Sequence, residues 1–469
     1  MVLEDDIAVV DGLLTRARAA QVRYETGATQ ARYDRAAQAA AWALLEPDRN
    51  RTLSELAVRT TGLGNVEDKV AKNHRKTLGL MRDVAPVATC GVIAEDPERG
   101  ITEIARPIGV IGAVVPSTNP VATPANNIIN ALKCGNAIVL SPSPKGTEAC
   151  GKLLDYIHHE FSKAGVDPGL VQMIPAPGNK ERTQRLLERA DLVVVTGSQD
   201  NVRRAYSSGT PAIGVGTGNV PVIVDETADV RAAAARIARS KTFDNATSCS
   251  SENALVVVDT VYDSFAASLA HEGCAILDPS LENHVVDRLW PGGKLNPLAI
   301  ARDCDVLIDI LDLDGRVPRG TRFLAVETGH AGPDHPIAGE KISLVTALYR
   351  ARDFAHAKAI VMRILQHAGA GHSVGLHTAL DERAVDLGLT LPACRIIVNQ
   401  AHAIATGGSF DNGMPFSLSM GCGSWGGNSI DENLHWKHFL NITRVVRTIP
   451  AREPVLEDVL ADYWAECGR

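Results

Sequence analysis

Apolar residues over the first 90 positions recur at the spacing of an α-helix. One face of the first predicted helix carries Ile7, Val10, Leu14 and Ala17. Further helical stretches, Ala-rich at first, follow as far as Lys76. From Cys90 short apolar runs are broken by Asp-Pro and Arg-Gly, which predicts an extended hairpin over about residues 90–108. Such a protruding hairpin often serves contact between subunits.

Between residues 107 and 225 short apolar runs alternate with helical stretches. Near-continuous apolar strands separated by helices are typical of a parallel sheet that is covered on both faces. The predicted strands are IGVIGAVVP, NAIVL, LVQMIP, LVVVTGS and NVPVIVD. A second block starts at about Thr227 with ALVVVD, FLAVET, SVGLHT and RIIVNQ, and the chain ends in a polar tail. We therefore expect an α/β fold with two doubly wound domains.

The expected first domain covers residues 1–240 and binds a nucleotide. The second domain covers residues 241–430, and a C-terminal segment over 431–469 returns to the first. A chain of 469 residues is too long for one ordinary hydrophobic core, which agrees with this division.

Composition and charge restrict the partners. With 45% hydrophobic and 22% charged residues and a net charge of −8, the chain has no general attraction to nucleic acid or to an anionic membrane. It contains no apolar run of 18 residues, and its acidic start, MVLEDD, is unlike a secretory signal. We predict a cytoplasmic protein that acts on small molecules.

The metal-binding patterns expected of zinc proteins are missing from the sequence. The nine cysteines are an odd number without a CxxC pair, so neither a disulfide framework nor a zinc ribbon is indicated. His367, His372 and His377 are spaced five apart, which neither a helix nor a strand presents on one face. We expect no metal, and packing roles suffice for these histidines.

Cys249 lies in a stretch of small and polar residues, FDNATSCSSE, between a predicted helix and the strand ALVVVD. A thiol in such a loop can stay accessible, and its own N–H can face a developing oxyanion. A lone loop cysteine is more often a small buried hydrophobe, so the rest of the sequence has to decide its role.

Four segments provide that context: RPIGVIGAVVPSTNP, TGSQDNVRRAYSSGTPAIGVGTGNVPVIVDETAD, KTFDNATSCSSEN and GCGSWGGNS, spread over residues 106–429. In them the chain resembles the aldehyde dehydrogenase superfamily, most closely its CoA-acylating branch, which includes acetaldehyde and sulfoacetaldehyde dehydrogenases. The resemblance implies that Cys249 is the nucleophile and Asn119 the oxyanion-hole amide. It also implies that several residues lie beside the cofactor: Pro116, Ser117, Thr196, Gly197 and Ser198.

The acyl acceptor is predicted from a missing residue. Hydrolytic members of the superfamily carry an E-L-G-G-K segment whose glutamate activates water, and here Gly214 or Val215 stands in its place. Without that base a thioester favours a thiol such as coenzyme A. Glu252 or Glu340 remains open as a remote base, so hydrolysis to a carboxylic acid is the alternative. A catalytically idle scaffold is a second alternative, against which Cys249, Asn119 and Glu340 weigh.

The cofactor is expected to be NAD or NADP. Glu340 resembles the glutamate that holds the nicotinamide ribose in this superfamily, although Ser343 and Leu344 replace the motif's Gly and Pro. Gly214 and Gly216 belong to a turn that we expect to pack closely beside the nucleophile and cofactor, with packing alone an equal explanation. The loop after NAIVL has no acid, and a 2′-phosphate could be bound there by Ser141, Ser143 and Lys145.

Small residues in the predicted tunnel loops, and an aromatic content of only 4%, favour a short aldehyde. Similarity to the sulfoacetaldehyde type suggests His402, Lys437 and Arg444 as contacts for an anionic head group, and Cys422 as a residue lining the substrate or CoA passage. We expect a homodimer or homotetramer.

Overall fold

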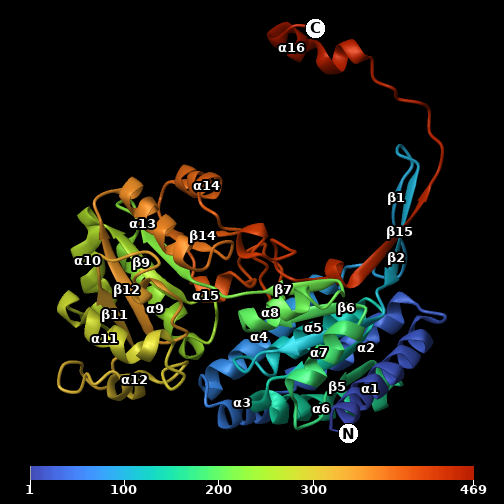
Figure 1. Cartoon of the computed structure of the whole chain (residues 1–469), viewed down its shortest axis with the longest axis horizontal. Coiled ribbons are helices and arrows are strands. Elements are labelled where there is room, and N and C mark those ends of the chain that lie inside the picture. The colour runs from blue at the N-terminus through green and yellow to red at the C-terminus, as the bar shows by residue number, and fades with distance from the viewer. Residues whose placement is uncertain (1) are drawn as a thin grey trace.

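The computed structural model describes residues 2–469 and contains two α/β bodies, a protruding sheet and a C-terminal arm (Figure 1). Four helices open the chain: α1 (Val2–Glu25), α2 (Gln30–Leu45), α3 (Pro47–Thr61) and α4 (Val66–Val84). At the start of α4 the Asn65 side chain accepts a hydrogen bond from the Asp68 N–H, and Gly62 ends α3 in a left-handed conformation. The predicted helical N-terminal region is confirmed.

The first body is built on five parallel strands in the order β5-β4-β3-β6-β7. They are β3 (Val110–Val115), β4 (Ala137–Pro142), β5 (Val171–Met173), β6 (Leu192–Thr196) and β7 (Ala212–Val215). The helices that connect them are α5 (Ala122–Lys133), α6 (Thr147–Ala164), α7 (Lys180–Arg189) and α8 (Gln199–Tyr206). Because β3 and β6 are neighbours whose connections leave in opposite directions, a binding crevice is expected at their carboxyl ends.

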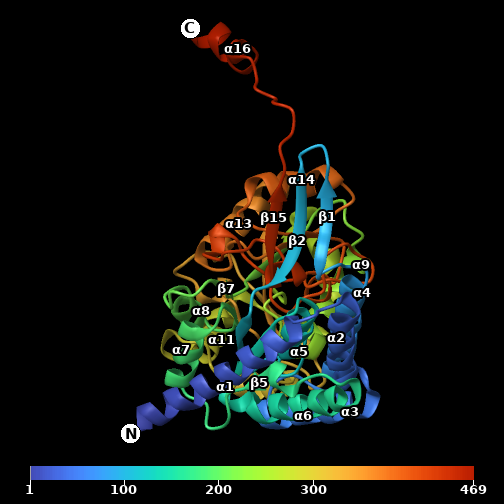
Figure 2. The ribbon, with the colours of Figure 1, turned by 90° about the vertical axis from the view of Figure 1, so that its right-hand side faces the viewer.

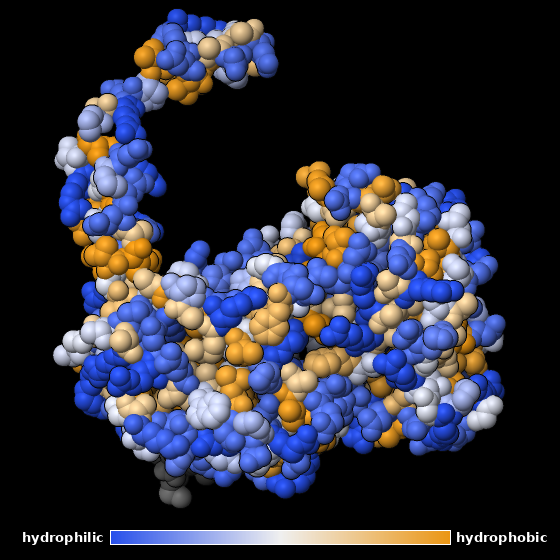
Figure 3. Space-filling view, turned by 180° about the vertical axis from the view of Figure 1, so that it is seen from behind, coloured by the Kyte–Doolittle hydropathy of each residue, from blue (hydrophilic) through white to orange (hydrophobic). Residues whose placement is uncertain are grey.

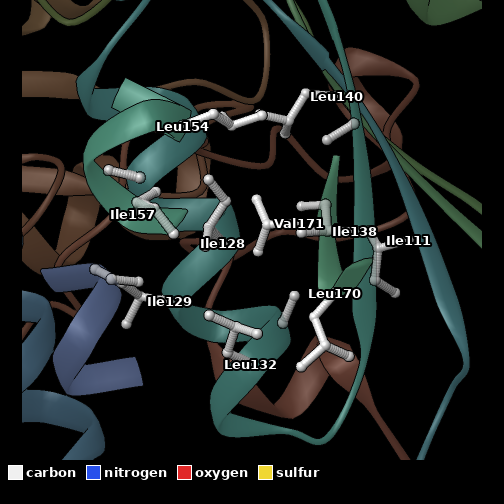
Figure 4. Close-up of a cluster of buried hydrophobic side chains, with 14 of the residues drawn as sticks. Ile111, Ile128, Ile129, Leu132, Ile138, Leu140, Leu154, Ile157, Leu170 and Val171 are labelled. Atoms are coloured by element: carbon white, nitrogen blue, oxygen red, sulfur yellow. The ribbon is translucent and has the colours of Figure 1, made fainter. Parts of the chain in front are cut away.

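The core under this sheet holds those strand ends in place. Figure 4 shows Ile128 and Leu132 of α5 between the strands, which contribute Ile138 and Val171, and Ile157 of α6. All five side chains are fully buried, and burial of each contributes roughly 1.5–3 kcal/mol. The crevice is therefore carried by a rigid support.

The second body contains seven parallel strands in the order β10-β11-β12-β9-β8-β13-β14. They are β8 (Val220–Val224), β9 (Glu252–Val258), β10 (Cys274–Leu277), β11 (Phe323–Glu327), β12 (Val345–Ala351), β13 (Val374–His377) and β14 (Ile396–Val398). Their helices are α9 (Val230–Thr242), α10 (Asp259–His271), α11 (Glu282–Leu289), α12 (Cys304–Ile310), α13 (Phe354–His367), α14 (Asp381–Thr390) and the short α15 (His402–Ala405).

Both predicted domain boundaries need correction. Strand β8 and helix α9 were assigned to the first domain, but β8 pairs with β9 and β13, and α9 packs in the second core. Phe416 was assigned to the second domain, but it lies in the first core with Leu434 and Phe439. A buried parallel strand has the same apolar pattern in either sheet, so the pattern cannot tell which sheet it joins.

The predicted hairpin is present as β1 (Gly91–Asp96) and β2 (Ile101–Pro107), paired antiparallel. A third strand, β15 (Leu440–Val446), lies on the other side of β2 (Figure 2). The end of the chain is thus not the plain polar tail that was expected, since after β15 it also forms helix α16 (Leu456–Cys467). Side chains of β15 alternate between the two faces of the sheet. Few local sequence signals for a strand precede β15, so the strand was not predicted.

Helix α16 stands away from both bodies, across an open concavity (Figure 3). Its apolar side chains Leu456, Val459 and Tyr463 are exposed, as is Val446 of β15. Within residues 2–469, no helix is both long enough and apolar enough to cross a membrane.

Candidate active site

A cavity of about 750 Å³ is lined by the strand ends of the first body, by helix α4 and by the loop that carries Cys249. Nearly all of the predicted catalytic and cofactor residues line it: Cys249, Asn119, Pro116, Ser117, Ser141, Ser143, Lys145, Thr196, Gly197, Ser198, Gly216 and Glu340. Residues far apart in the sequence thus meet at one place. The exception is Gly214, which does not line the cavity and instead bonds through its backbone with the Tyr206 hydroxyl.

The loop before Cys249 has an unusual backbone. Asp244, Asn245 and Ala246 have φ values of 50°, 51° and 59°, in the left-handed region that non-glycine residues seldom adopt. Such residues cost on the order of 1–3 kcal/mol each and persist only where their surroundings hold them. The buried Asp244 carboxylate supplies that hold, because it accepts hydrogen bonds from the ammonium groups of Lys69 and Lys72 on α4.

Cys249 has a histidine partner that the sequence interpretation dismissed. The His372 Nε2 lies 3.3 Å from the Cys249 Sγ, and its Nδ1 lies 2.7 Å from the Ser373 hydroxyl oxygen. Burial, together with nearby Arg395 and His402, lowers the pKa of His372 well below its usual value, so the ring is neutral. If Nδ1 donates to Ser373, Nε2 is the acceptor that faces the thiol. A packing role for His372 was therefore the wrong expectation.

The thiol needs such an acceptor. Burial raises the pKa of Cys249 to about 12, and nearby Glu340 and Cys422 add to the rise. A thiol with this pKa is almost entirely protonated at neutral pH, whereas the thiolate is the nucleophile. Arg395 helps to fix the pair, because its Nη1 donates to the carbonyl oxygen of His372 at 3.0 Å.

The Asn119 carboxamide is held in one orientation. The Lys72 Nζ donates to the Asn119 Oδ1 at 2.9 Å and also to the Thr247 hydroxyl oxygen at 2.8 Å. An ammonium group has only donors, so it must face the amide oxygen and not the amide nitrogen. The Nδ2 of Asn119 is left to donate to an oxygen atom in the cavity.

Glu340 lines the cavity near Cys249. Burial raises the pKa of its carboxyl to about 8, despite a hydrogen bond from the Gly218 backbone N–H. Gly218 packs against the nucleophile so closely that an added Cβ would lie 2.1 Å from the Cys249 carbonyl oxygen. The other acid considered as a base, Glu252, is buried and does not line the cavity. Of the two positions considered for the missing carboxylate, Val215 lines the cavity and Gly214 does not.

The cofactor end of the cavity lies at the carboxyl ends of β3, β4 and β6. The Ser143 hydroxyl there is buried without a hydrogen-bond partner, whereas the Ser141 hydroxyl lies 2.9 Å from that of Thr183. Lys145 and Lys180 are exposed at the rim. An unpartnered hydroxyl beside two ammonium groups suits a phosphate, so these residues are compatible with a dinucleotide.

Three residues suggested for an anionic head group do not reach the cavity. Arg444 lies on β15 and pairs with Glu103, and the Lys437 ammonium stacks on the ring of Trp436. His402 is buried against the carbonyl oxygen of Ser250, and burial lowers its pKa to about 4, so it is neutral. Cys422 is also buried and does not line the cavity. These four assignments are corrected, because sequence proximity to a tunnel loop does not place a side chain in the tunnel.

The cavity has a strong excess of positive charge. Its lining includes six basic side chains and one carboxyl group: Lys72, Arg75, Lys76, Lys145, Lys180 and Arg204 against Glu340. The described residues also contain two groups with metal-ligand spacing, Glu282 with His330 and His335, and Glu432 with His435 and His438, but neither lines the cavity. This site is suited to anionic organic ligands.

A cysteine–histidine pair between two doubly wound bodies, beside a crevice for a dinucleotide, is the arrangement of a cysteine-dependent dehydrogenase. The chain belongs to the aldehyde dehydrogenase family, whose sequence model matches residues 4–277. It is 53% identical over 461 residues to a sulfoacetaldehyde dehydrogenase (acylating) from Cupriavidus necator, which covers 98% of this chain and 93% of the relative.

Two further relatives support the same family assignment. A succinate-semialdehyde dehydrogenase (acetylating) from Clostridium kluyveri is 36% identical over 399 residues, covering 85% of this chain and 87% of the relative. The crystal structure of an acetylating aldehyde dehydrogenase from Geobacillus thermoglucosidasius superposes with a TM-score of 0.92 at 31% identity, covering 97% of this chain and all of the other. The predicted family and α/β fold are confirmed.

Proposed function

We propose that this protein oxidises a short aldehyde on Cys249 and transfers the acyl group to coenzyme A, with NAD or NADP as the hydride acceptor. The observation that carries the proposal is the Cys249–His372 pair in a cation-rich cavity whose β7–β8 loop supplies no carboxylate. The three relatives named above, whose names describe acylating or acetylating enzymes, support the same reaction. Sulfoacetaldehyde is the candidate substrate.

The first half-reaction forms a bond to sulfur. His372 Nε2 takes the thiol proton, and the Cys249 thiolate adds to the carbonyl carbon of the aldehyde. Asn119 Nδ2 donates to the resulting alkoxide, and one such donor contributes roughly 3 kcal/mol to the transition state. A bound nicotinamide ring would accept the hydride from the same carbon. A thioester on Cys249 remains, and Glu340 and the serine-lined crevice would hold the cofactor's ribose and phosphates.

The second half-reaction returns the thiol. His372, once it has lost the first proton to solvent, accepts the proton of the coenzyme A thiol. The coenzyme A sulfur then attacks the thioester carbonyl, Cys249 leaves as a thiolate, and this thiolate takes the proton from His372 to regenerate the thiol. Gly214 or Val215 stands where hydrolytic relatives carry their water-activating glutamate, and neither supplies a base, so attack by a thiol is favoured over attack by water.

Hydrolysis is the second candidate function, and one observation favours it. Glu340 lies in the cavity with a pKa raised by burial to about 8, which is the range of an effective general base. Incubation with a short aldehyde and NAD or NADP, with and without coenzyme A, separates the two. Acyl-CoA as the product by mass supports acylation, whereas a carboxylic acid at an undiminished rate without coenzyme A overturns it. A Cys249→Ala variant should lose either reaction.

The expectation of a homodimer or homotetramer remains a prediction. It is supported by the exposed apolar side chains of β15 and α16, which a second copy of the chain would cover. The cytoplasmic location remains a prediction as well.

A further inference from the structure

Helix α4 presents three lysines to the cavity region on one face. Lys69, Lys72 and Lys76 are spaced three and four residues apart, which places them along the same side of a helix. Each is buried, with 4–6% of its surface exposed. A buried ammonium group is unfavourable unless an anion or several acceptors compensate for the water that it has lost.

The structure provides one carboxylate for these three lysines. Asp244 forms ion pairs with Lys69 and Lys72. Lys76 lies one turn further along, and among the described residues no carboxylate lies within ion-pair distance of it. Its Nζ donates to the carbonyl oxygen of Gly407, its one hydrogen-bond acceptor within the described part of the chain. Two of its three N–H donors remain for another acceptor.

The neighbouring cation, Arg75, is bound to the backbone through one of its nitrogens. Its Nη1 donates to the carbonyl oxygens of Ile404 and Gly408, both at 3.1 Å, and so supports the loop that faces Lys76. Lys76 is held between this loop and the ring of Phe416, whose centroid lies 5.6 Å from the Nζ. Lys76 is therefore a fixed and buried basic group at this end of the cavity that keeps free donors, whereas Arg75 is only partly buried.

The charge of Lys76 depends on its surroundings. Burial lowers its pKa well below the usual value, and neighbouring Arg75 and Lys72 lower it further. Cys249 and Asp83 act in the opposite sense, and Lys76 and Cys249 line the same cavity. A bound anion would act in the same sense as Cys249 and would stabilise the ammonium form.

We propose that Lys76 is the specificity residue of the site and binds an acidic group, a sulfonate or a carboxylate, carried by the aldehyde a short distance from its carbonyl. This inference rests on the proposed function and deepens it by naming the residue that selects acidic aldehydes. A sulfonate or carboxylate supplies the acceptor oxygens and the negative charge that this ammonium lacks. A neutral aldehyde supplies neither. Lys76 thus takes the place of the three residues that the sequence suggested.

Lys76→Met removes the charge and keeps the length of the apolar stem. We expect kcat/KM for sulfoacetaldehyde to fall on the order of 100-fold, as truncation of one member of a buried charge pair does, while propionaldehyde changes by less than about threefold. Lys76→Arg should restore part of the lost rate. Succinate semialdehyde separates the two acids: a parallel loss shows that the subsite accepts carboxylates, and an unchanged rate confines it to sulfonates.

Retained propionaldehyde oxidation shows that the variant is folded. The matched control is Lys180→Met, which removes a lysine at the cofactor end and should leave the ratio of the two rates unchanged. Equal losses for charged and neutral aldehydes in Lys76→Met would overturn the inference and leave the proposed function intact. A wild-type protein that makes no acyl-CoA would overturn the proposed function instead. A binding readout tests the same contact: 2-hydroxyethanesulfonate should protect Cys249 from alkylation in the wild type and not in Lys76→Met, and equal protection in both would contradict the subsite.

Discussion

The two ends of the cavity use positive charge in different ways. At the cofactor end Lys145 and Lys180 are exposed, so water screens each charge and each contributes little by itself. At the nucleophile end Lys72 and Lys76 are buried, where an interaction is stronger and an unpaired group is costly. Changes at the nucleophile end should therefore have large effects on catalysis. Changes at the cofactor end should have a modest effect on the preference between NAD and NADP.

The largest effect is expected from His372→Ala. Without the neutral imidazole the Cys249 thiol, whose pKa burial raises to about 12, must lose its proton to solvent. We expect kcat/KM to fall by roughly 10³-fold at pH 7, within the range for loss of a general base. The activity of the variant relative to the wild type should rise from about pH 7 to 9, because His372 stays neutral there in the wild type, whereas the variant depends on loss of the thiol proton to solvent.

His377 provides the matched control for that experiment. It is also buried, and burial lowers its pKa to about 4, but it does not line the cavity. His377→Gln should leave the shape of the pH profile unchanged. If His372→Ala kept the wild-type profile, the general-base assignment would be wrong.

A smaller effect is expected from Lys72→Met, which frees the Asn119 amide to rotate. We expect kcat to fall about 10- to 100-fold with little change in KM, because an amide that is no longer held contributes less to the oxyanion. Lys69→Met is the control, since Lys69 shares the Asp244 carboxylate but does not contact the Asn119 side chain. Steady-state kinetics of the double variant Lys72→Met/Asn119→Ala checks the coupling: additive losses would contradict it.

The smallest effect belongs to the cofactor end. Ser143→Asp places a carboxylate where the free hydroxyl lies, which should disfavour a 2′-phosphate and favour a ribose diol. We expect the ratio of kcat/KM for NADP to that for NAD to fall about tenfold. Ser141→Ala, at a hydroxyl already paired with Thr183, should leave the ratio nearly unchanged. If Ser143→Asp left this ratio unchanged, the 2′-position of the cofactor's ribose would lie elsewhere.

Much of the fold and part of the site followed from the sequence. The helical start, the hairpin and the alternation of strands and helices follow from short-range periodicity, which the chain itself carries. The family and its nucleophile, oxyanion and cofactor positions were predicted from motifs such as STNP and TGS, because glycine, proline and small polar residues at fixed offsets mark particular turns.

Other features required the tertiary structure. The sheet that β8 joins depends on pairing over long distances, and identical apolar patterns serve either sheet. His372, Lys72 and Lys76 lie in helical or glycine-rich stretches without a motif, and only folding brings them to Cys249 and Asn119. Conversely, Lys437 and Arg444 had the right charge for an acidic substrate but point elsewhere.

The sequence by itself therefore determined the class of chemistry, because a reactive thiol in a small-residue loop and a crevice-forming turn are local features. The tertiary structure decided how the thiol is activated and which cation lacks a counter-charge. Both are properties of burial and of contacts between residues more than 100 positions apart, such as His372 with Cys249. Burial changes the pKa of an ionisable group and the free energy of leaving it unpaired, and no local pattern encodes it.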